Sequence, residues 1–377
     1  MSDFPNLTED QALRRLIRRR IASEGGITFR DFMAMCLYEP GHGYYASARE
    51  KLGREGDYLT SPTVSPLFAA MLGRQLREMW LLLDEPAHFA VVETGAGTGV
   101  LACDLLTWLR SAAPQLFAAI DYRIAEVSEP LRGEQQRLLN ATGLVEKVRW
   151  QDSFSTDSIE GCILSNELLD SFPVQRVKLQ DGALREVYVC LDGDAFREEL
   201  REPSTPELAA YFERLGLLPG EGCYAEVNLQ ALDWLREAAA GLRRGFLLTF
   251  DYGYEAADLY APWRREGTLL CFYRHGTSTD PYQRIGRQDM TSHVDFSSLR
   301  AAGEAAGLQT LGLVSQAQFL SRLGIEEALR QPEGAGLEEH FARRRAVLDL
   351  TDEAGLGRIR VLAQARGVES PRLTGIG

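Results

Sequence analysis

A short apolar run followed by three alternating glycines constrains this chain more than any other feature. Residues 88–92 have the length and apolar character of a buried strand, and Glu93-Thr-Gly-Ala-Gly-Thr-Gly99 follows them. Residues 100–110 then have the spacing of a helix with one apolar face. Glycine adopts backbone angles that other residues avoid, and it lets the backbone approach a ligand closely. Strand, glycine loop and helix in this order are typical of the nucleotide site in open α/β sheets.

The spacing of the glycines separates two classes of cofactor. A dinucleotide loop has the pattern G-x-G-x-x-G, because the pyrophosphate binds at the helix N-terminus. Here Gly95, Gly97 and Gly99 alternate, and Glu93 stands two positions before the first of them. A carboxylate repels a phosphate but attracts a ligand ammonium group, directly or through water. The loop therefore resembles motif I of S-adenosylmethionine-dependent methyltransferases, and a glycine-rich turn without a ligand is the alternative.

The composition is that of a globular protein with a sizeable core. Of 377 residues, 45% are hydrophobic and 25% charged, which suits roughly two domains or one domain with insertions. No apolar run approaches the ~20 residues that a membrane-spanning helix needs. The net charge of −13 disfavours nucleic acid as a partner, because that binding depends on neutralising phosphates. A basic protein or peptide is compatible with this charge.

The cysteines and the N-terminal arginines bear on cellular location. None of the six cysteines lies within four residues of another, so we expect neither a zinc site nor a disulfide framework. Residues 13–21 are Arg-rich and amphipathic, as transit peptides are, but the acidic residues Asp3, Glu9 and Asp10 precede them. We interpret this segment as a docking helix and expect the protein in the reducing cytoplasm.

Alternating strands and helices indicate a wound, mostly parallel sheet. Strands are expected at 88–93, 121–127, 144–151 and 162–165, with helices at 99–111 and 129–141. Asp181-Gly182 lies between two β-rich runs and predicts a hairpin. The alternation then resumes with a helix, two strands, a helix and a strand at 229–242, 246–250, 267–274, 296–306 and 308–315.

These elements predict a division of the chain into segments. Residues 1–80 form an N-terminal extension of helices and loops that contributes to the site, and residues 81–175 and 226–325 form the core. Residues 176–225 form a β-rich and helical insertion that is a candidate substrate region. Residues 326–377 form a C-terminal helical tail.

The strand ends carry the groups that could bind a nucleoside, because ligands of open α/β sheets lie outside the carboxyl ends of the strands. Glu126 ends the second strand, where a carboxylate can accept hydrogen bonds from two ribose hydroxyls. Asp152 follows the third strand and is a candidate acceptor for an adenine amino group. The alternatives are a surface glutamate at a strand end and a turn aspartate.

The fourth strand ends in Asn166-Glu-Leu-Leu-Asp170, and we expect the catalytic group here. Asn166 offers carbonyl acceptors near the methyl donor. Glu167 and Asp170 could hold a guanidinium through charge-assisted bidentate bonds, or they are helix N-terminal acids that offset the dipole. Asp251 ends the fifth strand in a similar position, with a turn residue as the alternative.

A long polar segment, residues 275–296, is rich in turn formers and is interpreted as a substrate lid. His275 and His293 invite a metal interpretation, but no His-Glu-x-x-His motif or matching Cys/His set accompanies them. We therefore expect no metal, and we expect these histidines to make local hydrogen bonds.

Six stretches in a fixed order extend the resemblance beyond the glycine loop. They are Leu37-Tyr-Glu-Pro-Gly-His-Gly-Tyr-Tyr45, Gly56-Asp-Tyr-Leu-Thr-Ser-Pro62, Glu93-Thr-Gly-Ala-Gly-Thr-Gly99, Asn166-Glu-Leu-Leu-Asp170 with Phe172-Pro173, Phe250-Asp-Tyr-Gly253 and His293-Val-Asp-Phe296. In this set the chain resembles the MidA-type methyltransferases, which are related to a mitochondrial complex I assembly factor that methylates a protein arginine. Thr94 departs from the aliphatic residue expected there, and nothing beyond residue 325 matches.

The resemblance implies a class I, Rossmann-like methyltransferase fold, S-adenosyl-L-methionine as methyl donor and a protein arginine as acceptor, with a respiratory complex I subunit as a candidate. The expected cofactor contacts are Thr60, Ser61, Glu93, Gly95, Gly97, Gly99, Glu126, Asp152 and Asn166. The expected substrate contacts are Tyr252, His293 and Asp295. The expected catalytic residues are Glu167, Asp170 and Asp251.

Three other functions stay open at this point. A small-molecule N- or O-methyltransferase would use Asn166 as its key acceptor. A cofactor-binding assembly factor would need little catalysis. An NAD enzyme is disfavoured by the spacing of the glycines.

Overall fold

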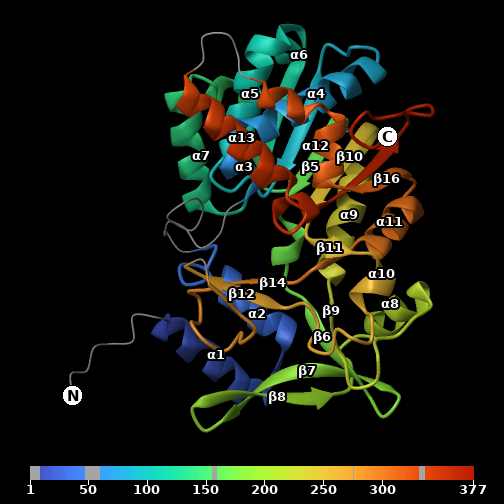
Figure 1. The fold of residues 1–377 in the computed structure, drawn as a ribbon. Helices are drawn as coiled ribbons and strands as arrows, with labels where there is room; N and C mark the ends of the chain where they lie inside the picture. The colour runs from blue at the N-terminus through green and yellow to red at the C-terminus, as the bar shows by residue number, and fades with distance from the viewer. Residues whose placement is uncertain (1–8, 47–59, 155–158, 275, 331–335) are drawn as a thin grey trace, which may run out of the picture. The chain divides into compact units, whose positions relative to one another are not determined.

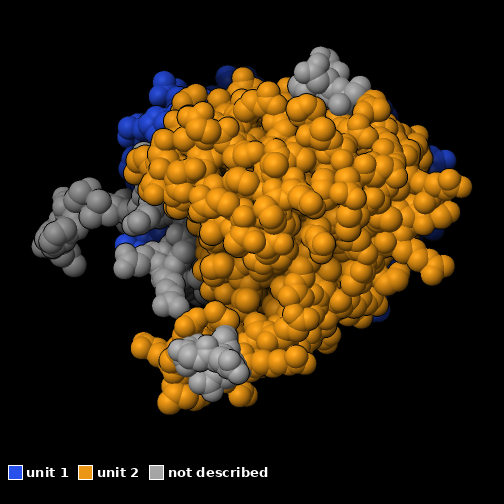
Figure 2. All heavy atoms as spheres, turned by 90° about the horizontal axis from the view of Figure 1, so that it is seen from above, with its two compact units in different colours: residues 1–58, 169–233, 253–299 blue, residues 59–168, 234–252, 300–377 orange. Residues whose placement is uncertain are grey.

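The computed structural model describes residues 9–46, 60–154, 159–274, 276–330 and 336–377. The chain forms two compact units, which are coloured separately in Figure 2. Unit 1 consists of Met1–Tyr58, Leu169–Asp233 and Gly253–Leu299. Unit 2 consists of Leu59–Leu168, Trp234–Tyr252 and Arg300–Gly377. Each unit has its own hydrophobic core.

Unit 2 is built on a seven-stranded mixed sheet (Figure 1). Its strands, in spatial order, are β16 (Gln309–Ser315), β17 (Arg360–Arg366), β10 (Leu242–Asp251), β5 (Ile159–Asn166), β2 (Phe89–Thr94), β3 (Ile120–Ala125) and β4 (Val148–Gln151). From β10 to β4 all neighbours run parallel, whereas β17 is antiparallel to both β10 and β16. Every residue of β2 is buried, as expected for a parallel strand with both faces covered.

The helices of unit 2 contribute apolar side chains to the same hydrophobic core as the sheet. They are α3 (Ser61–Val64), α4 (Pro66–Leu82), α5 (Val100–Ala112), α6 (Pro114–Ala119), α7 (Glu129–Ala141), α12 (Gln316–Arg322) and α13 (Leu337–Thr351), with short 3-10 turns at Val145–Lys147, Ile325–Leu329 and Leu356–Arg358. In α5 the leucines 101, 105, 106 and 109 recur at helical spacing and are all buried. Two further helices, α9 (Leu229–Gly241) and α11 (Phe296–Ala305), begin in unit 1 and end in unit 2.

Unit 1 combines small sheets with short helices. Its five-stranded sheet contains β1 (Ile27–Thr28), β6 (Gln175–Gln180), β7 (Ala183–Asp192), β8 (Ala195–Arg201) and β9 (Tyr224–Val227), and β7 and β8 form the long hairpin seen in Figure 1. Its smaller strands are β11 (Gly253–Tyr254) with β15 (Val294–Asp295), and β12 (Leu270–Tyr273) with β13 (Gly276–Ser278) and β14 (Asp289–Thr291). Its helices are α1 (Gln11–Glu24), α2 (Phe29–Tyr38), α8 (Glu207–Leu215) and α10 (Ala256–Leu259), with a 3-10 turn at Leu169–Ser171.

Local chemistry explains where the N-terminal helices begin and which face they bury. The side chain of Asp10 accepts a hydrogen bond from the backbone N–H of Leu13 at 2.9 Å, so it caps α1. The hydroxyl of Thr28 accepts from the N–H of Asp31 at 3.1 Å and caps α2. Leu13, Ile17 and Ile21 share the buried face of α1, which agrees with its interpretation as a docking helix.

Several predicted elements are confirmed, and one is wrong. Helix α7 covers residues 129–141 as predicted, and the hairpin at Asp181-Gly182 has the positive φ angles, 52° and 71°, that a tight turn between β6 and β7 requires. The C-terminal tail, however, is not a helical tail. Residues 360–366 form β17, which lies between β10 and β16, because a short apolar run does not distinguish strand from helix by periodicity alone.

The two units group the segments differently from the expected domains. Residues 61–80, expected in the N-terminal extension, supply α3 and most of α4 to unit 2. Residues 253–299, expected in the core, lie in unit 1, where β11 pairs with β15. The fold class is α/β with a mixed sheet. Within the described ranges, no helix combines the length and hydropathy needed to cross a bilayer.

Candidate functional site

The carboxyl ends of the central strands of unit 2 meet at one edge of the sheet. The last residues of β2, β3 and β5 are level with one another, since Thr94 pairs with Ala125 on one side and with Ser165 on the other. The adjacent strand β10 is in register with β5 up to Asn166. The strands therefore deliver four of the predicted site residues to the same edge: Glu93, Glu126, Asn166 and Asp251.

The glycine loop requires glycine both for its backbone and for its space. Gly95, Gly97 and Gly99 have φ angles of 68°, 53° and 84°, in the left-handed region that other residues rarely adopt. A Cβ at Gly95 would lie 2.6 Å from the side chain of Leu168, and a Cβ at Gly99 would lie 3.0 Å from that of Gln135. Glycine is therefore required here by the packing of Leu168 and Gln135 as well as by the backbone conformation.

Glu93 is a buried carboxyl with one close partner. Its side chain accepts a hydrogen bond of 2.7 Å from the hydroxyl of Tyr122, and the residue is only 3% exposed. Burial raises the pKa of Glu93 to about 7, the bond from Tyr122 opposes the rise, and the nearby charge of Glu126 adds to it. A cation bound beside this carboxyl would favour its ionised form.

Gln135 on α7 ties the glycine loop to the ribose-binding candidate Glu126. Its side-chain amide donates to the carbonyl of Gly97 at 2.8 Å and lies 3.4 Å from a carboxylate oxygen of Glu126, while its oxygen accepts from the indole of Trp150 at 2.8 Å. Sequence reasoning missed Gln135. The available signal was a polar residue on the buried face of α7, four positions before Leu139.

Arg132 is a second residue that sequence reasoning missed. Its guanidinium donates to the backbone carbonyl of Glu126 at 2.6 Å and also pairs with the exposed carboxylate of Asp152. Arg132 therefore holds Asp152 near the end of β3. The predicted contact of Asp152 with an adenine ring stays a prediction.

The turn after β5 is strained and is held in place by β10. Glu167 has a φ of 50°, which costs an ordinary side chain about 1 kcal/mol. Its N–H donates to the carbonyl of Phe250 at 2.9 Å, and the next N–H, of Leu168, donates to the fully buried carboxylate of Asp251 at 3.2 Å. Strain that the surrounding structure maintains in this way is typical of functional sites.

The carboxyl of Glu167 has two hydrogen-bond donors and a raised pKa. One of its oxygens accepts from the N–H of Ser61 and from the side-chain amide of Asn166, both at 3.1 Å. Burial of the carboxyl, with a smaller contribution from Asp251, raises the pKa of Glu167 to about 8. The buried side-chain oxygen of Asn166 has no hydrogen-bond partner among the residues that the structure describes.

The other predicted residues of unit 2 lie on short flanking segments. Thr60 precedes α3 as its N-cap residue, and Ser61 is the first residue of that helix. Residues 56–59 of the matching stretch lie outside the described residues. Tyr252 follows β10 directly, with the guanidinium of Arg358 at 5.5 Å from its ring centroid.

Three predicted site residues, Asp170, His293 and Asp295, belong to unit 1. Asp170 is buried in the turn Leu169–Ser171, and its backbone carbonyl accepts from the N–H of Ser292 at 2.9 Å. Asp295 is also buried; its carboxylate accepts from the hydroxyls of Tyr211 and Ser298, both at 2.6 Å, at the start of α11. The observed bonds of Asp295 stabilise that helix start, and its predicted contact with substrate is untested.

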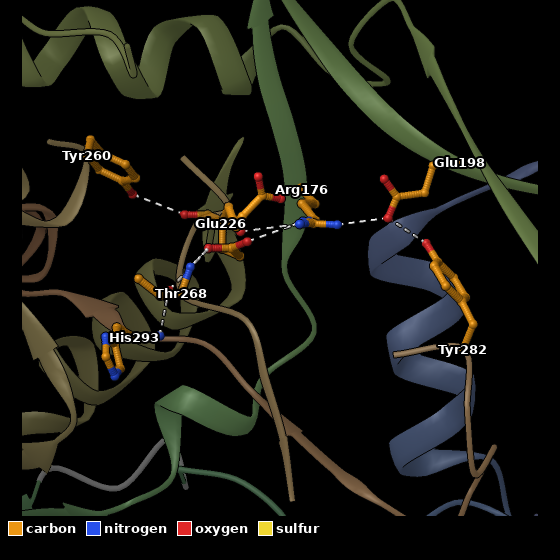
Figure 3. Close-up of polar contacts among 8 residues, drawn as sticks. Arg176, Glu198, Glu226, Tyr260, Thr268, Tyr282 and His293 are labelled. Carbon is orange, nitrogen blue, oxygen red and sulfur yellow. Dashed lines mark hydrogen bonds and ion pairs between the residues drawn. The ribbon is translucent and has the colours of Figure 1, made fainter. Parts of the chain in front are cut away.

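His293 adjoins a buried ion network in unit 1, shown in Figure 3. The backbone N–H of His293 donates to the hydroxyl of Thr268 at 3.1 Å, and the backbone N–H of Thr268 donates to the carboxylate of Glu226 at 2.7 Å. Arg176 lies between the carboxylates of Glu226, at 3.4 Å, and Glu198, at 2.8 Å. Charges buried in this way need partners, and these groups supply them to one another.

The ring of His293 packs edge-on against Tyr254, with 5.2 Å between the centroids. The described residues contain no cluster of three His, Cys, Asp or Glu side chains with a geometry suited to a metal ion. His275, the other histidine of the predicted lid, lies outside the described residues, and the lid itself stays a prediction.

Two solved structures resemble this chain over almost its full length. A crystal structure of a protein from Burkholderia thailandensis bound to S-adenosyl-homocysteine is 37% identical in sequence, covers 97% of this chain and 94% of its own, and has a TM-score of 0.88. A native crystal structure of a protein from the same organism is also 37% identical, with the same coverage and a TM-score of 0.86.

Curated relatives add similarity over most of the chain. The mitochondrial protein arginine methyltransferase NDUFAF7 homolog of Drosophila melanogaster is 30% identical over 395 residues, spanning 96% of this chain and 86% of the relative. The human protein arginine methyltransferase NDUFAF7 is 28% identical, spanning 84% of this chain and 74% of its own length. Both relatives are named as mitochondrial proteins, and this finding overturns the prediction of a cytoplasmic location.

A family model described as S-adenosyl-L-methionine-dependent methyltransferase matches residues 71–314. This range contains the glycine loop, Glu126, Asn166 and Asp251, which meet at one edge of the sheet. The left-handed backbone of the glycine loop, the buried carboxyls of Glu93 and Glu126, and the unpartnered side-chain oxygen of Asn166 suit a nucleoside with a cationic side chain. The chain therefore belongs to the family of S-adenosyl-L-methionine-dependent methyltransferases, with S-adenosyl-L-methionine as its methyl donor.

Proposed function

We propose that this protein methylates an arginine side chain of another protein, on a class I, Rossmann-like methyltransferase fold. The strand order of unit 2 supports the fold. The chain winds outward from β2, to β3 and β4 on one side and to β5 and β10 on the other, so the glycine loop lies at the point where the strand order reverses. Ligands of open α/β sheets bind at such a switch point.

The residues around the glycine loop would hold the donor. Glu93 and the loop would hold its methionine part, since the carboxyl favours an ammonium group, and Glu126 would accept from its ribose hydroxyls. When bound, S-adenosylmethionine supplies a methyl group that its sulfonium has already activated. The protein then mainly orients the acceptor nitrogen, and such positioning can lower the barrier by several kcal/mol.

The surroundings of Glu167 are the main support for arginine as the methyl acceptor. The Glu167 carboxyl and the partnerless oxygen of Asn166 are two hydrogen-bond acceptors at the end of β5, and a guanidinium offers paired N–H donors in a fixed fork. The high pKa of arginine keeps it protonated before the reaction, so Glu167, a second carboxylate or a water must receive the released proton. The name of the relatives, protein arginine methyltransferase, supports the same acceptor.

Asp251 and Asp170 have different proposed roles. Asp251 would position Glu167, because it accepts from the N–H of Leu168 in the strained turn. Asp170 stays a candidate second carboxylate for the guanidinium. Tyr252, His293 and Asp295 stay candidate contacts to the protein substrate.

The test compares Glu167→Gln with Glu160→Gln at the opposite end of the same strand, β5. Each variant is incubated with radiolabelled S-adenosylmethionine and an extract of cells that lack this gene, and hydrolysed protein is examined for labelled methylarginine. We expect Glu167→Gln to lose about 10²-fold or more in rate, as removal of a proton acceptor does, with unchanged affinity for S-adenosyl-homocysteine. Glu160→Gln should retain full activity.

Three results would contradict the proposal. Full transfer by a Glu167→Gln protein with normal cofactor binding would remove Glu167 from the mechanism. Label that appears only in small molecules would favour the small-molecule methyltransferase. Tight cofactor binding without any transfer by the wild-type protein would favour an assembly factor.

A further inference from the structure

Gln316 is a fully buried polar residue at the start of α12, and both ends of its side-chain amide are used. Its nitrogen donates to the backbone carbonyl of Leu350 at 3.0 Å, and its oxygen accepts from the hydroxyl of Ser61 at 2.8 Å. Leu350 lies in the last turn of α13, where helix carbonyls have no partner within the helix. A carbonyl can only accept, so the orientation of the amide is fixed.

These contacts continue to the candidate catalytic carboxyl. Ser61 is fully buried, and its N–H donates to Glu167 at 3.1 Å. The backbone N–H of Gln316 also donates to the carbonyl of Ile359, immediately before β17, at 2.7 Å. A continuous series of hydrogen bonds thus links Leu350, Gln316, Ser61 and Glu167, all within unit 2.

We propose that Gln316 is a positioning residue for methyl transfer, because it fixes Ser61 and thereby the orientation of the Glu167 carboxyl. The C-terminal segment, in which the sequence shows no recognisable motif, would then serve the active site as well as the sheet. The inference rests on the proposed role of Glu167. It requires no contact between Gln316 and either substrate.

Geometry supports a role in positioning over one in stability alone. If the side chain at position 316 only filled space, methionine would do so equally well, because it has a similar volume and no polar group to desolvate. Glu167 sits in a strained backbone conformation, so its carboxyl depends on fixed partners to stay in one orientation. Ser61 supplies one of those partners, and Gln316 holds the hydroxyl of Ser61.

The test uses Gln316→Met, with Gln75→Met as a matched control. Gln75 is the same residue type, is equally buried in unit 2, and also binds the C-terminal segment, since it accepts from the N–H of Gly375 at 3.0 Å. We expect Gln316→Met to lower the turnover of labelled S-adenosylmethionine about 10- to 100-fold, as misplacement of a reacting group does, with its KM changed less than about threefold. Gln75→Met should lower the thermal stability by a similar amount and leave turnover unchanged.

A second readout does not depend on the acceptor. The pKa of Glu167 can be followed by NMR of protein labelled with ¹³C at the glutamate carboxyls, with the signal assigned by its loss in Glu167→Gln. The N–H of Ser61 stabilises the ionised carboxylate, so a displaced Ser61 should move this pKa further above its value of about 8. Asp251, the other titratable group that acts on Glu167, is unchanged in both variants.

A double-mutant cycle with Ser61→Ala completes the test. If Gln316 acts through Ser61, the double variant Ser61→Ala/Gln316→Met should be no slower than the slower single variant. Additive losses, or an unmoved pKa of Glu167 in Gln316→Met, would overturn the inference. If the pKa of Glu167 moves in Gln316→Met but the wild-type protein labels no protein, the proposed function is contradicted. The role of Gln316 in orienting Glu167 then stands.

Discussion

At the scale of single residues, the chemistry of the site depends mainly on two carboxyls, that of the buried residue Glu93 and that of the partly buried residue Glu167. Burial raises the pKa of the first to about 7 and that of the second to about 8. Both side chains are kept in place by neutral donors, Tyr122 for Glu93 and Ser61 with Asn166 for Glu167. Carboxyls in such surroundings ionise readily once a cation arrives, which suits a site for a cationic donor and a guanidinium.

This arrangement predicts that cofactor binding depends on pH. An ammonium group beside Glu93 requires the ionised carboxylate, so binding lowers its pKa below the free value of about 7 and releases a proton. The affinity for S-adenosyl-homocysteine should rise by up to about tenfold per pH unit as pH approaches 7 and level off above it.

Calorimetric titrations in two buffers of different ionisation enthalpy would detect the released proton. The Glu93→Gln variant should bind more weakly at pH 8 and lose the pH dependence. An affinity that stays constant from pH 5.5 to 8 would show that Glu93 does not respond to the ligand.

At the scale of elements, strand ends and the glycine loop are where local sequence is most informative. The loop follows a strand and precedes a helix in the sequence itself, and the positive φ angles of its glycines follow from that geometry. Gln135 was missed because its importance comes from the packing of α7 on the loop and on β4, which no local pattern shows.

A glycine of the loop can be compared with a glycine elsewhere in unit 2 that has a similar φ angle. Gly95 and Gly143 have φ angles of 68° and 66°, but a Cβ would meet Leu168 at 2.6 Å in the first and nothing within 4 Å in the second. Gly143→Ala should cost only the left-handed conformation, about 1–2 kcal/mol in urea unfolding. Gly95→Ala should cost more and should also displace Leu168, which follows Glu167.

Cofactor affinity separates the two effects. S-adenosyl-homocysteine should bind Gly143→Ala as it binds the wild type, and Gly95→Ala at least about tenfold more weakly, the difference that 1.4 kcal/mol produces. Equal affinity of the two variants would show that the space beside Gly95 is not needed.

At the scale of the whole molecule, the C-terminal strand β17 completes the sheet that carries the site. It pairs with β10 on one side and with β16 on the other, and residues 361–365 are buried. It also runs antiparallel to its neighbours, so the sheet is mixed. A protein cut before this strand would expose both flanking strands.

Leu362 tests this dependence. It is fully buried and pairs with Thr249 on β10 and Leu313 on β16. Leu362→Asp buries an unpaired charge in the sheet and should destabilise by more than about 4 kcal/mol, whereas Leu362→Met keeps the volume and should cost less than about 1.5 kcal/mol. Thermal unfolding followed by circular dichroism measures both, and a stable Leu362→Asp protein would contradict the central place of β17.

The sequence by itself determined the glycine loop, the strand ends at Glu93, Glu126 and Asn166, and the methyltransferase family, because each of these is read from short stretches of neighbouring residues. Only the tertiary structure decided that residues 360–366 are a strand, that residues 253–299 lie in unit 1, and that Gln135 and Gln316 contact the site. The physical reason is that buried hydrogen bonds between distant segments are selected by packing. A polar residue with a distant partner looks the same in sequence as one that faces water.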